Sequence, residues 1–74
     1  MDTVDASGLL CPFPVIRIQN YVRGVESGTL IRLLATDPGV LEDIPAWCRI
    51  HGHQIQSQAK QDSTFEFHIL VGSN

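Results

Sequence analysis

Residues 8–14 read Gly-Leu-Leu-Cys-Pro-Phe-Pro, and this stretch is where a strand pattern changes into a helical one. Before it, residues 3–5 are a short strand candidate that ends in a turn-like Ala-Ser-Gly. From Pro12 onward, apolar residues recur at helical spacing. Proline suits the first helical position, because its missing N–H would be unpaired there. The stretch therefore predicts a helix with Cys11 as its N-cap.

The middle of the chain predicts a strand followed by a second helix. Residues 29–35 are apolar almost throughout, which is typical of a central strand. A helical repeat of apolar residues follows, but Pro45 interrupts it. Because proline removes a donor and crowds the preceding turn, we expect a loose turn over residues 38–42. The firm helix should then begin with Asp43 as N-cap and end at Gly52.

Two alternating runs close the chain, Gln54–Gln61 and residues 64–71, and they predict an antiparallel hairpin with one face on the core. In the first run this alternation groups Ile55, Ser57 and Ala59. The resulting order is β-α-β-α-β-β. We expect an α/β (α+β) two-layer sandwich, in which two helices cover one face of a four-stranded mixed sheet.

Length and composition limit what such a chain can do. Seventy-four residues make one domain, spanning residues 1–74, with little chain to spare for a closed active-site cavity. With 43% hydrophobic and 18% charged residues, the chain has the composition of a folded globular domain. A reactive group must then lie at the surface or be completed by a partner. This favours a carrier or adaptor over a self-contained enzyme.

The charge pattern argues against nucleic acid and membrane as direct partners. The net charge is -3, and the five basic residues are scattered singly, whereas phosphate binding needs them clustered. No apolar run is long enough to span a membrane, and the N-terminal residues lack the pattern of a signal peptide. Two cysteines without an export signal indicate reduced thiols, so we expect a cytoplasmic protein without a structural disulfide.

Cys11 is the residue best placed for chemistry. A thiol at a helix start lies beside the positive end of the helix dipole, which favours the nucleophilic thiolate. Leu9, Leu10 and Phe13 would desolvate that thiolate and oppose the effect, so we expect only a modestly lowered pKa for Cys11. The residue types alone leave an alternative open, in which Cys11 is a small apolar residue packed into a corner of the fold.

Residues 5–14, Asp-Ala-Ser-Gly-Leu-Leu-Cys-Pro-Phe-Pro, resemble the signature of the TusA/SirA-like sulfur-carrier family, whose hallmark is Cys-Pro-x-Pro at the start of the first helix. Residues 35–38, 43–48 and 52–53 are also similar to that family. The resemblance extends over nearly the whole chain. It implies a β-α-β-α-β-β sandwich, the same architecture that the hydrophobic pattern predicts.

The resemblance implies sulfur relay. Cys11 would be the catalytic residue of a sulfurtransferase-type carrier and hold sulfur as a persulfide, supported by Gly8, Pro12 and Pro14, with no cofactor and no metal. The donor would be a cysteine desulfurase or a rhodanese-type protein, and a downstream protein would accept the sulfur. Relatives serve tRNA thiolation, molybdenum-cofactor supply or sulfur oxidation. Many relatives carry a polar residue where this chain has Leu10.

The remaining candidates have structural explanations. Cys48 shares a helix face with apolar residues, which favours core packing over a role as a resolving thiol. His51 and His53 flank Gly52 and are interpreted as turn residues. The alternative is a metal site in which Cys48 and His51 share a helix face, but no second pair of ligands completes it. Trp47 is expected in the core. In the same way, Asp37 is explained as a turn or cap residue and His68 as a solvated side chain.

Two further hypotheses stand beside the carrier. One is a non-catalytic regulatory or interaction module with the same fold. The other is a nucleic-acid-binding domain that uses the open sheet face, which the acidic balance disfavours.

Overall fold

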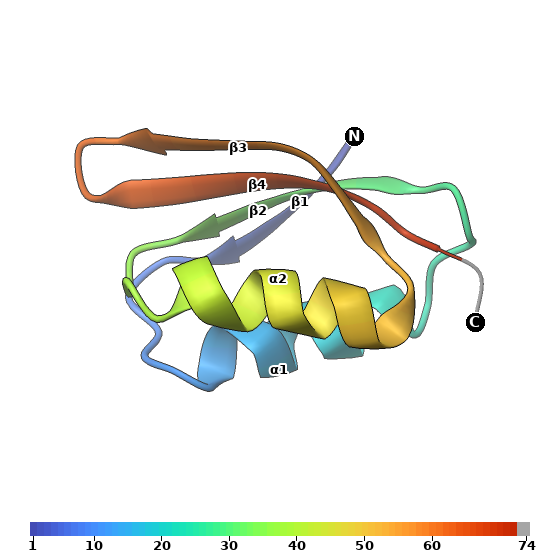
Figure 1. The fold of residues 1–74 in the computed structure, drawn as a ribbon, viewed down its shortest axis with the longest axis horizontal. Coiled ribbons are helices and arrows are strands. Elements are labelled where there is room, and N and C mark those ends of the chain that lie inside the picture. The colour runs from blue at the N-terminus through green and yellow to red at the C-terminus, as the bar shows by residue number, and fades with distance from the viewer. Residues whose placement is uncertain (73–74) are drawn as a thin grey trace.

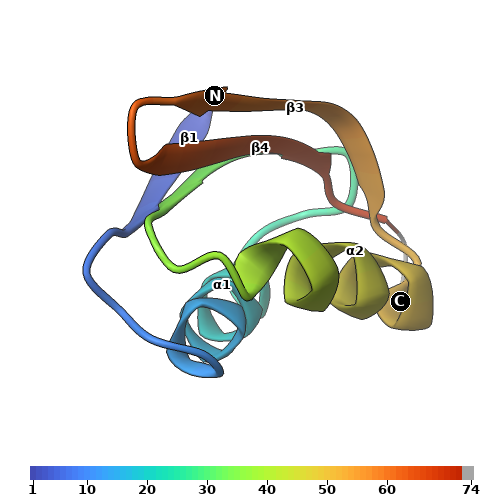
Figure 2. The ribbon, with the colours of Figure 1, turned by 60° about the vertical axis from the view of Figure 1, so that its left-hand side comes forward.

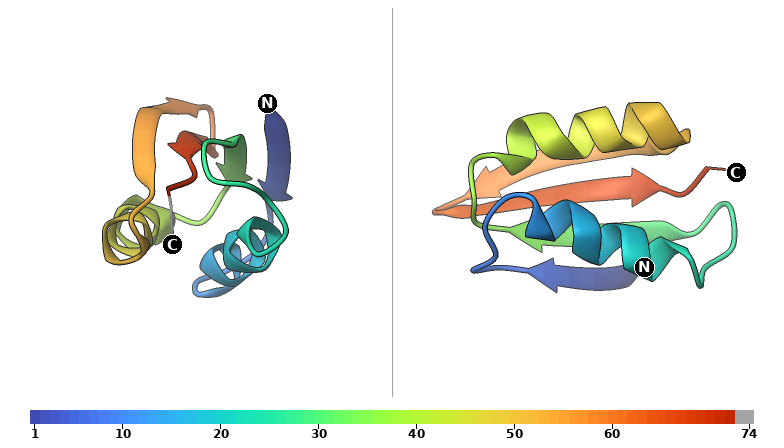
Figure 3. Two further views of the ribbon diagram at one scale, coloured as in Figure 1. Left: turned by 90° about the vertical axis from the view of Figure 1, so that its right-hand side faces the viewer. Right: turned by 90° about the horizontal axis from the view of Figure 1, so that it is seen from below.

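The computed structural model describes residues 1–72 and shows two layers, a sheet and a pair of helices (Figure 1). The element order is β1 (Asp2–Ala6), α1 (Phe13–Val22), β2 (Leu30–Ala35), α2 (Val40–His51), β3 (Gln54–Gln61) and β4 (Thr64–Leu70). Both helices lie on the same face of the sheet (Figure 3). The predicted order and architecture are therefore confirmed. The strand bounds differ from the predicted ones by a residue at most, and those of β3 agree.

The four strands form one mixed sheet in the order β1-β2-β4-β3. β1 and β2 are parallel, with Ala6 opposite Ala35 at their carboxyl ends. β4 is antiparallel to both β2 and β3. Because parallel strands end at the same edge of a sheet, the loops after β1 and β2 start side by side. This edge is where the Cys-Pro-Phe-Pro stretch lies.

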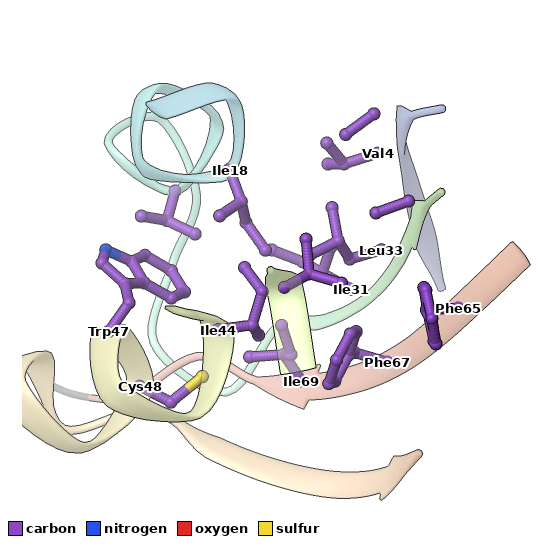
Figure 4. Close-up of a cluster of buried hydrophobic side chains, with 14 of the residues drawn as sticks. Val4, Ile18, Ile31, Leu33, Ile44, Trp47, Cys48, Phe65, Phe67 and Ile69 are labelled. Atoms are coloured by element: carbon purple, nitrogen blue, oxygen red, sulfur yellow. The ribbon is translucent and has the colours of Figure 1, made fainter. Parts of the chain in front are cut away.

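The core fills the space between the sheet and the helices (Figure 4). Its members come from every element except β3, which contributes only a partly buried residue. The largest side chains without solvent contact include Ile18, Ile31, Leu33, Ile44 and Phe67. Every second residue of β2 and β4 points into this space. Residues spaced by about one helical turn on α1 and α2 point into it from the other side. No helix in the described part of the chain is long and apolar enough to cross a membrane.

The second helix begins earlier than predicted. α2 starts at Val40 with Gly39 as N-cap and contains Pro45, so the predicted loose turn and the Asp43 cap were wrong. In a helix without proline, the N–H of residue 45 would donate to the carbonyl oxygen of Leu41, a residue that is 42% exposed. Water can therefore replace the lost bond. Burial of Val40 and Ile44 offsets what remains of the proline's cost.

β3 departs from the predicted burial. It is the edge strand, and a register shift between Ile55 and Ser57 interrupts its pairing with β4. Ile55 is half-buried, whereas Ser57 and Ala59 are exposed. The expectation that this face of β3 meets the core was therefore wrong beyond Ile55. The reason is the register shift, because beyond it Ser57 pairs with His68 and Ala59 with Glu66, so both lie on the face of the sheet turned away from the helices. The hairpin turn itself projects beyond α2 (Figures 1 and 2).

Candidate functional site

Cys11 lies in the loop between β1 and α1, two residues before the first helical residue, Phe13. The N-cap position is held by Pro12, with φ -97° and ψ 15°, and no side chain caps the helix. The N–H of Phe13 donates to the carbonyl oxygen of Leu10 at 2.8 Å, so it is not available to the sulfur. The prediction that Cys11 caps this helix was therefore wrong. Its sulfur lies outside the first helical turn.

The three supporting residues named from the sequence each shape this loop. Gly8 has a φ of +80°, a left-handed conformation that side chains rarely adopt, and its N–H donates to Thr36 Oγ1 at 2.8 Å. This bond ties the loop to the end of β2. Pro14 occupies the second helical position and is buried, while Pro12 is exposed beside Cys11. Together they hold Cys11 at the surface, close to the loop after β2.

Two carboxylates contact Cys11. Its Sγ donates to Asp43 Oδ2 on α2 at 2.6 Å, and its N–H donates to Asp37 Oδ2 at 3.3 Å. The hydrogen bond to Asp43 raises the pKa of the Cys11 thiol, and desolvation and the charges of both carboxylates add to the effect. The predicted lowering of this pKa was therefore wrong. The positive end of the α1 dipole lies at Phe13, whereas the charged groups nearest to the Cys11 sulfur are the two carboxylates.

Exposure separates the two cysteines. Cys11 is exposed, which argues against the alternative of a packed corner residue. Cys48 is only 3% exposed and belongs to the core cluster, as the helical spacing predicts (Figure 4). Burial raises the pKa of Cys48 to about 11. Of the two thiols, only that of Cys11 can be reached by another molecule without local unfolding.

A shallow, mostly apolar hollow of about 330 Å³ opens beside Cys11, between α1 and α2. Val15, Trp47 and Ile50 contribute to its walls. Two further apolar side chains near the sulfur are exposed, Leu10 at 68% and Phe13 at 56%. Leu10 occupies the position at which the resemblance leads us to expect a polar residue. The surroundings of the thiol therefore combine an apolar surface with two acidic groups.

Sequence reasoning missed two contacts. Asp43 was interpreted as a helix cap, and its contact with Cys11 was hidden because the start of α2 was misplaced. The signal was present, since Asp43 precedes Trp47 by one helical turn and so shares its face. His53 was interpreted as a turn residue but is 6% exposed, with its ring centroid 4.6 Å from that of Trp47.

The other assignments hold in part. Asp37 serves the turn, since its Oδ2 also accepts the N–H of Gly39 at 3.2 Å. His51 is exposed at the end of α2. His68 is not simply solvated, because it is half-buried and its Nε2 lies 2.6 Å from Glu66 Oε2. Within residues 1–72, no group of three or more His, Cys, Asp or Glu side chains could hold a metal ion.

Comparisons with known proteins point to one family. The family model described as "Sulfurtransferase TusA" matches residues 2–71. The chain is 39% identical over 66 residues to a sulfur carrier protein TusA from Pseudomonas putida strain F1, covering 89% of this chain and 82% of that one. It is also 39% identical to a protein of the same name from Pseudomonas aeruginosa strain LESB58, covering 89% and 84%. The crystal structure of a SirA-like protein from Desulfitobacterium hafniense superposes with a TM-score of 0.82 at 27% identity, covering 99% and 100%.

Proposed function

This chain belongs to the TusA family, and from that premise we propose that it is a sulfur carrier in which Cys11 holds the sulfur as a persulfide. The observation that carries the assignment to Cys11 is its exposure, since the only other thiol in the chain, Cys48, is buried in the core. A sulfur relay needs a thiol that a second protein can reach, and Cys11 meets that requirement.

Loading is an exchange of one S–S bond for another. The Cys11 sulfur attacks the terminal sulfur of a donor protein's cysteine persulfide, forming a new S–S bond as the donor's own S–S bond breaks. The donor cysteine leaves and takes up the proton that Cys11 gives up. Unloading repeats this exchange, with a cysteine thiolate of the acceptor protein attacking the outer sulfur that Cys11 holds, so that the Cys11 thiol is released. The transferred sulfur keeps its oxidation state throughout, so the exchange requires no oxidant and no redox cofactor.

The open site is suited to partners that are proteins. Cys11 lies beside a shallow hollow rather than inside a closed cavity, so within residues 1–72 nothing encloses its sulfur. The donor is a cysteine desulfurase or a rhodanese-type protein, and the acceptor is a protein of tRNA thiolation, molybdenum-cofactor synthesis or sulfur oxidation. The exposed side chains of Leu10 and Phe13 are positioned to be buried in such complexes.

Intact-mass spectrometry tests the proposal. The purified protein is incubated with cysteine, a cysteine desulfurase and its pyridoxal phosphate, and the mass is measured before and after treatment with a thiol reductant. We expect one added sulfur atom that the reductant removes. Cys11→Ser should show no addition, and Cys48→Ser should load as the parent does. A chain that gains no sulfur would favour the interaction module instead, and a Cys11→Ser variant that still gains sulfur would overturn the assignment to Cys11.

A further inference from the structure

The contact between Cys11 and Asp43 joins two parts of the chain that are far apart in sequence. Asp43 Oδ2 lies 2.6 Å from Cys11 Sγ, across the boundary between the β1–α1 loop and α2. The Asp43 backbone is fixed, because its N–H donates to the carbonyl oxygen of Gly39 at 3.0 Å. On the other side, the Cys11 N–H donates to Asp37. The sulfur is therefore held between two anchored segments.

Each element beside the sulfur can be searched for titratable groups in contact with Cys11 or lining the same hollow. The loop after β2 contributes Asp37, and α2 contributes Asp43 together with His51, which lines the same hollow. From α1 and the residues before it, the hollow receives only the uncharged Pro12 and Val15. In the described part of the chain, no Lys or Arg side chain is hydrogen-bonded to Cys11, Asp37 or Asp43.

The chain packs closely around Gly39, which lies next to both Asp37 and Cys11. A Cβ atom at Gly39 would lie 2.8 Å from Asp37 Oδ2 and 3.4 Å from the Cβ of Cys11. The φ of Gly39 is -57°, so its backbone does not require glycine. The missing side chain instead leaves room for the Asp37 carboxylate and Cys11 to approach α2. This geometry supports the contact independently of the hydrogen bond itself.

We infer that Asp43 is a positioning residue for the sulfur-carrying thiol, whose carboxylate orients Cys11 Sγ and keeps it protonated while the carrier is free. The inference rests on the proposed function and deepens it. A thiolate, not a thiol, attacks a sulfane sulfur, so the free carrier reacts slowly with electrophiles. Loading then requires that the donor complex separate Sγ from Asp43 or take the proton away. The Cys11 thiol therefore reacts readily only when the carrier is bound to a partner protein.

The test is the pH profile of Cys11 alkylation, measured in a Cys48→Ala background so that one thiol is observed. Rates with iodoacetamide are recorded from about pH 6 to pH 10, a range that spans ordinary thiol titration. We expect Asp43→Asn to move the midpoint to lower pH and to raise the rate at neutral pH by about threefold or more, because a neighbouring negative charge is removed. Asp43→Ala should do the same without adding an amide.

Glu42→Gln is the matched control, because it removes the same charge from an exposed neighbouring residue of α2. It should leave the profile unchanged. A merely structural role of Asp43 would lower stability without moving the midpoint. Equal shifts in Asp43→Asn and Glu42→Gln, or no shift in either, would overturn the inference. Thermal unfolding of each variant shows whether it is folded.

A second measurement needs no substitution at position 43, so it remains valid even if the Asp43 variants do not fold. The Cys48→Ala protein is alkylated in its native state and again when unfolded in urea. The inference requires a higher midpoint in the native state, and an equal or lower one contradicts it. Failure of the proposed function is recognised separately, since the persulfide assay reports sulfur uptake whereas alkylation reports only the state of the thiol.

Discussion

The N–H of Gly72 donates to Nδ1 of His53 at 3.0 Å, so the segment after β4 is attached to the loop that follows α2. His53 is 6% exposed and its ring lies against Trp47, with 4.6 Å between the ring centroids. Accepting this bond requires Nδ1 to be unprotonated. Desolvation lowers the pKa of His53, and the nearby His51 lowers it further. The native state therefore favours the neutral imidazole.

Stability should consequently fall on mild acidification. The unfolded chain binds the His53 proton more readily than the native state, so the contribution of His53 is complete above about pH 6.5, the ordinary histidine value. It declines as the pH drops below that value and through the lowered pKa of the folded state. Urea unfolding at a series of pH values measures this. His53→Gln should flatten the slope in that window, while His51→Gln, at an exposed position, should retain the larger part of the slope, which comes from desolvation of His53.

Replacing Cys11 by serine should separate function from stability. Cys11 is exposed and does not cap α1, and a serine hydroxyl can still donate to Asp43. We expect the free energy of unfolding to change by less than about 0.5 kcal/mol, as is usual for surface substitutions. Sulfur loading should be abolished. A loss of stability above about 2 kcal/mol in thermal or urea unfolding would instead identify Cys11 as a packed residue.

The two thiols should differ in accessibility. Brief treatment of the native protein with iodoacetamide should modify Cys11 first, even though Asp43 raises its pKa, because Cys48 is buried and has a pKa of about 11. Peptide mapping measures the two rates. Cys48 should become reactive only when urea unfolds the chain. Comparable rates for both cysteines in the native state would contradict the burial of Cys48 and the assignment of Cys11 as the sole carrier site.

The fold was predictable because its signals are local and periodic. Alternation along β4 and helical spacing along α1 each specify which face is buried, and only one sheet can bury both helices. The second helix was misplaced because Pro45 is a strong helix breaker in isolation. The helical spacing of Val40 and Ile44 was visible in the sequence, but it does not reveal that their burial outweighs the local cost of the proline.

The sequence was enough to identify Cys11 as the candidate residue, but not to predict the charges around its sulfur. Cys11 could be found from its neighbours in sequence, and its exposure agrees with that prediction. The groups that control its proton lie 26 and 32 residues away, in the loop after β2 and on α2. The parallel pairing of β1 with β2 brings the first of these to Cys11. The expectation from the helix dipole and the neighbouring apolar residues therefore gave the wrong direction for the pKa of Cys11.

The segment after β4 provides the last prediction. A Cβ atom at Gly72 would lie 1.8 Å from the carbonyl oxygen of Gly52, a backbone atom that cannot rotate away. Gly72→Ala should therefore separate the two segments, break the bond to His53 and lower the free energy of unfolding by about 1–3 kcal/mol, the range for overpacked sites.

Gly24→Ala is the matched control, since its nearest neighbour would be 3.9 Å away. Urea unfolding compares the two variants. The acid-dependent slope from His53 should weaken in Gly72→Ala and persist in Gly24→Ala, because only the first loses the bond that favours the neutral imidazole. Equal stabilities for both variants would show that the chain after β4 is free to move away from Gly52.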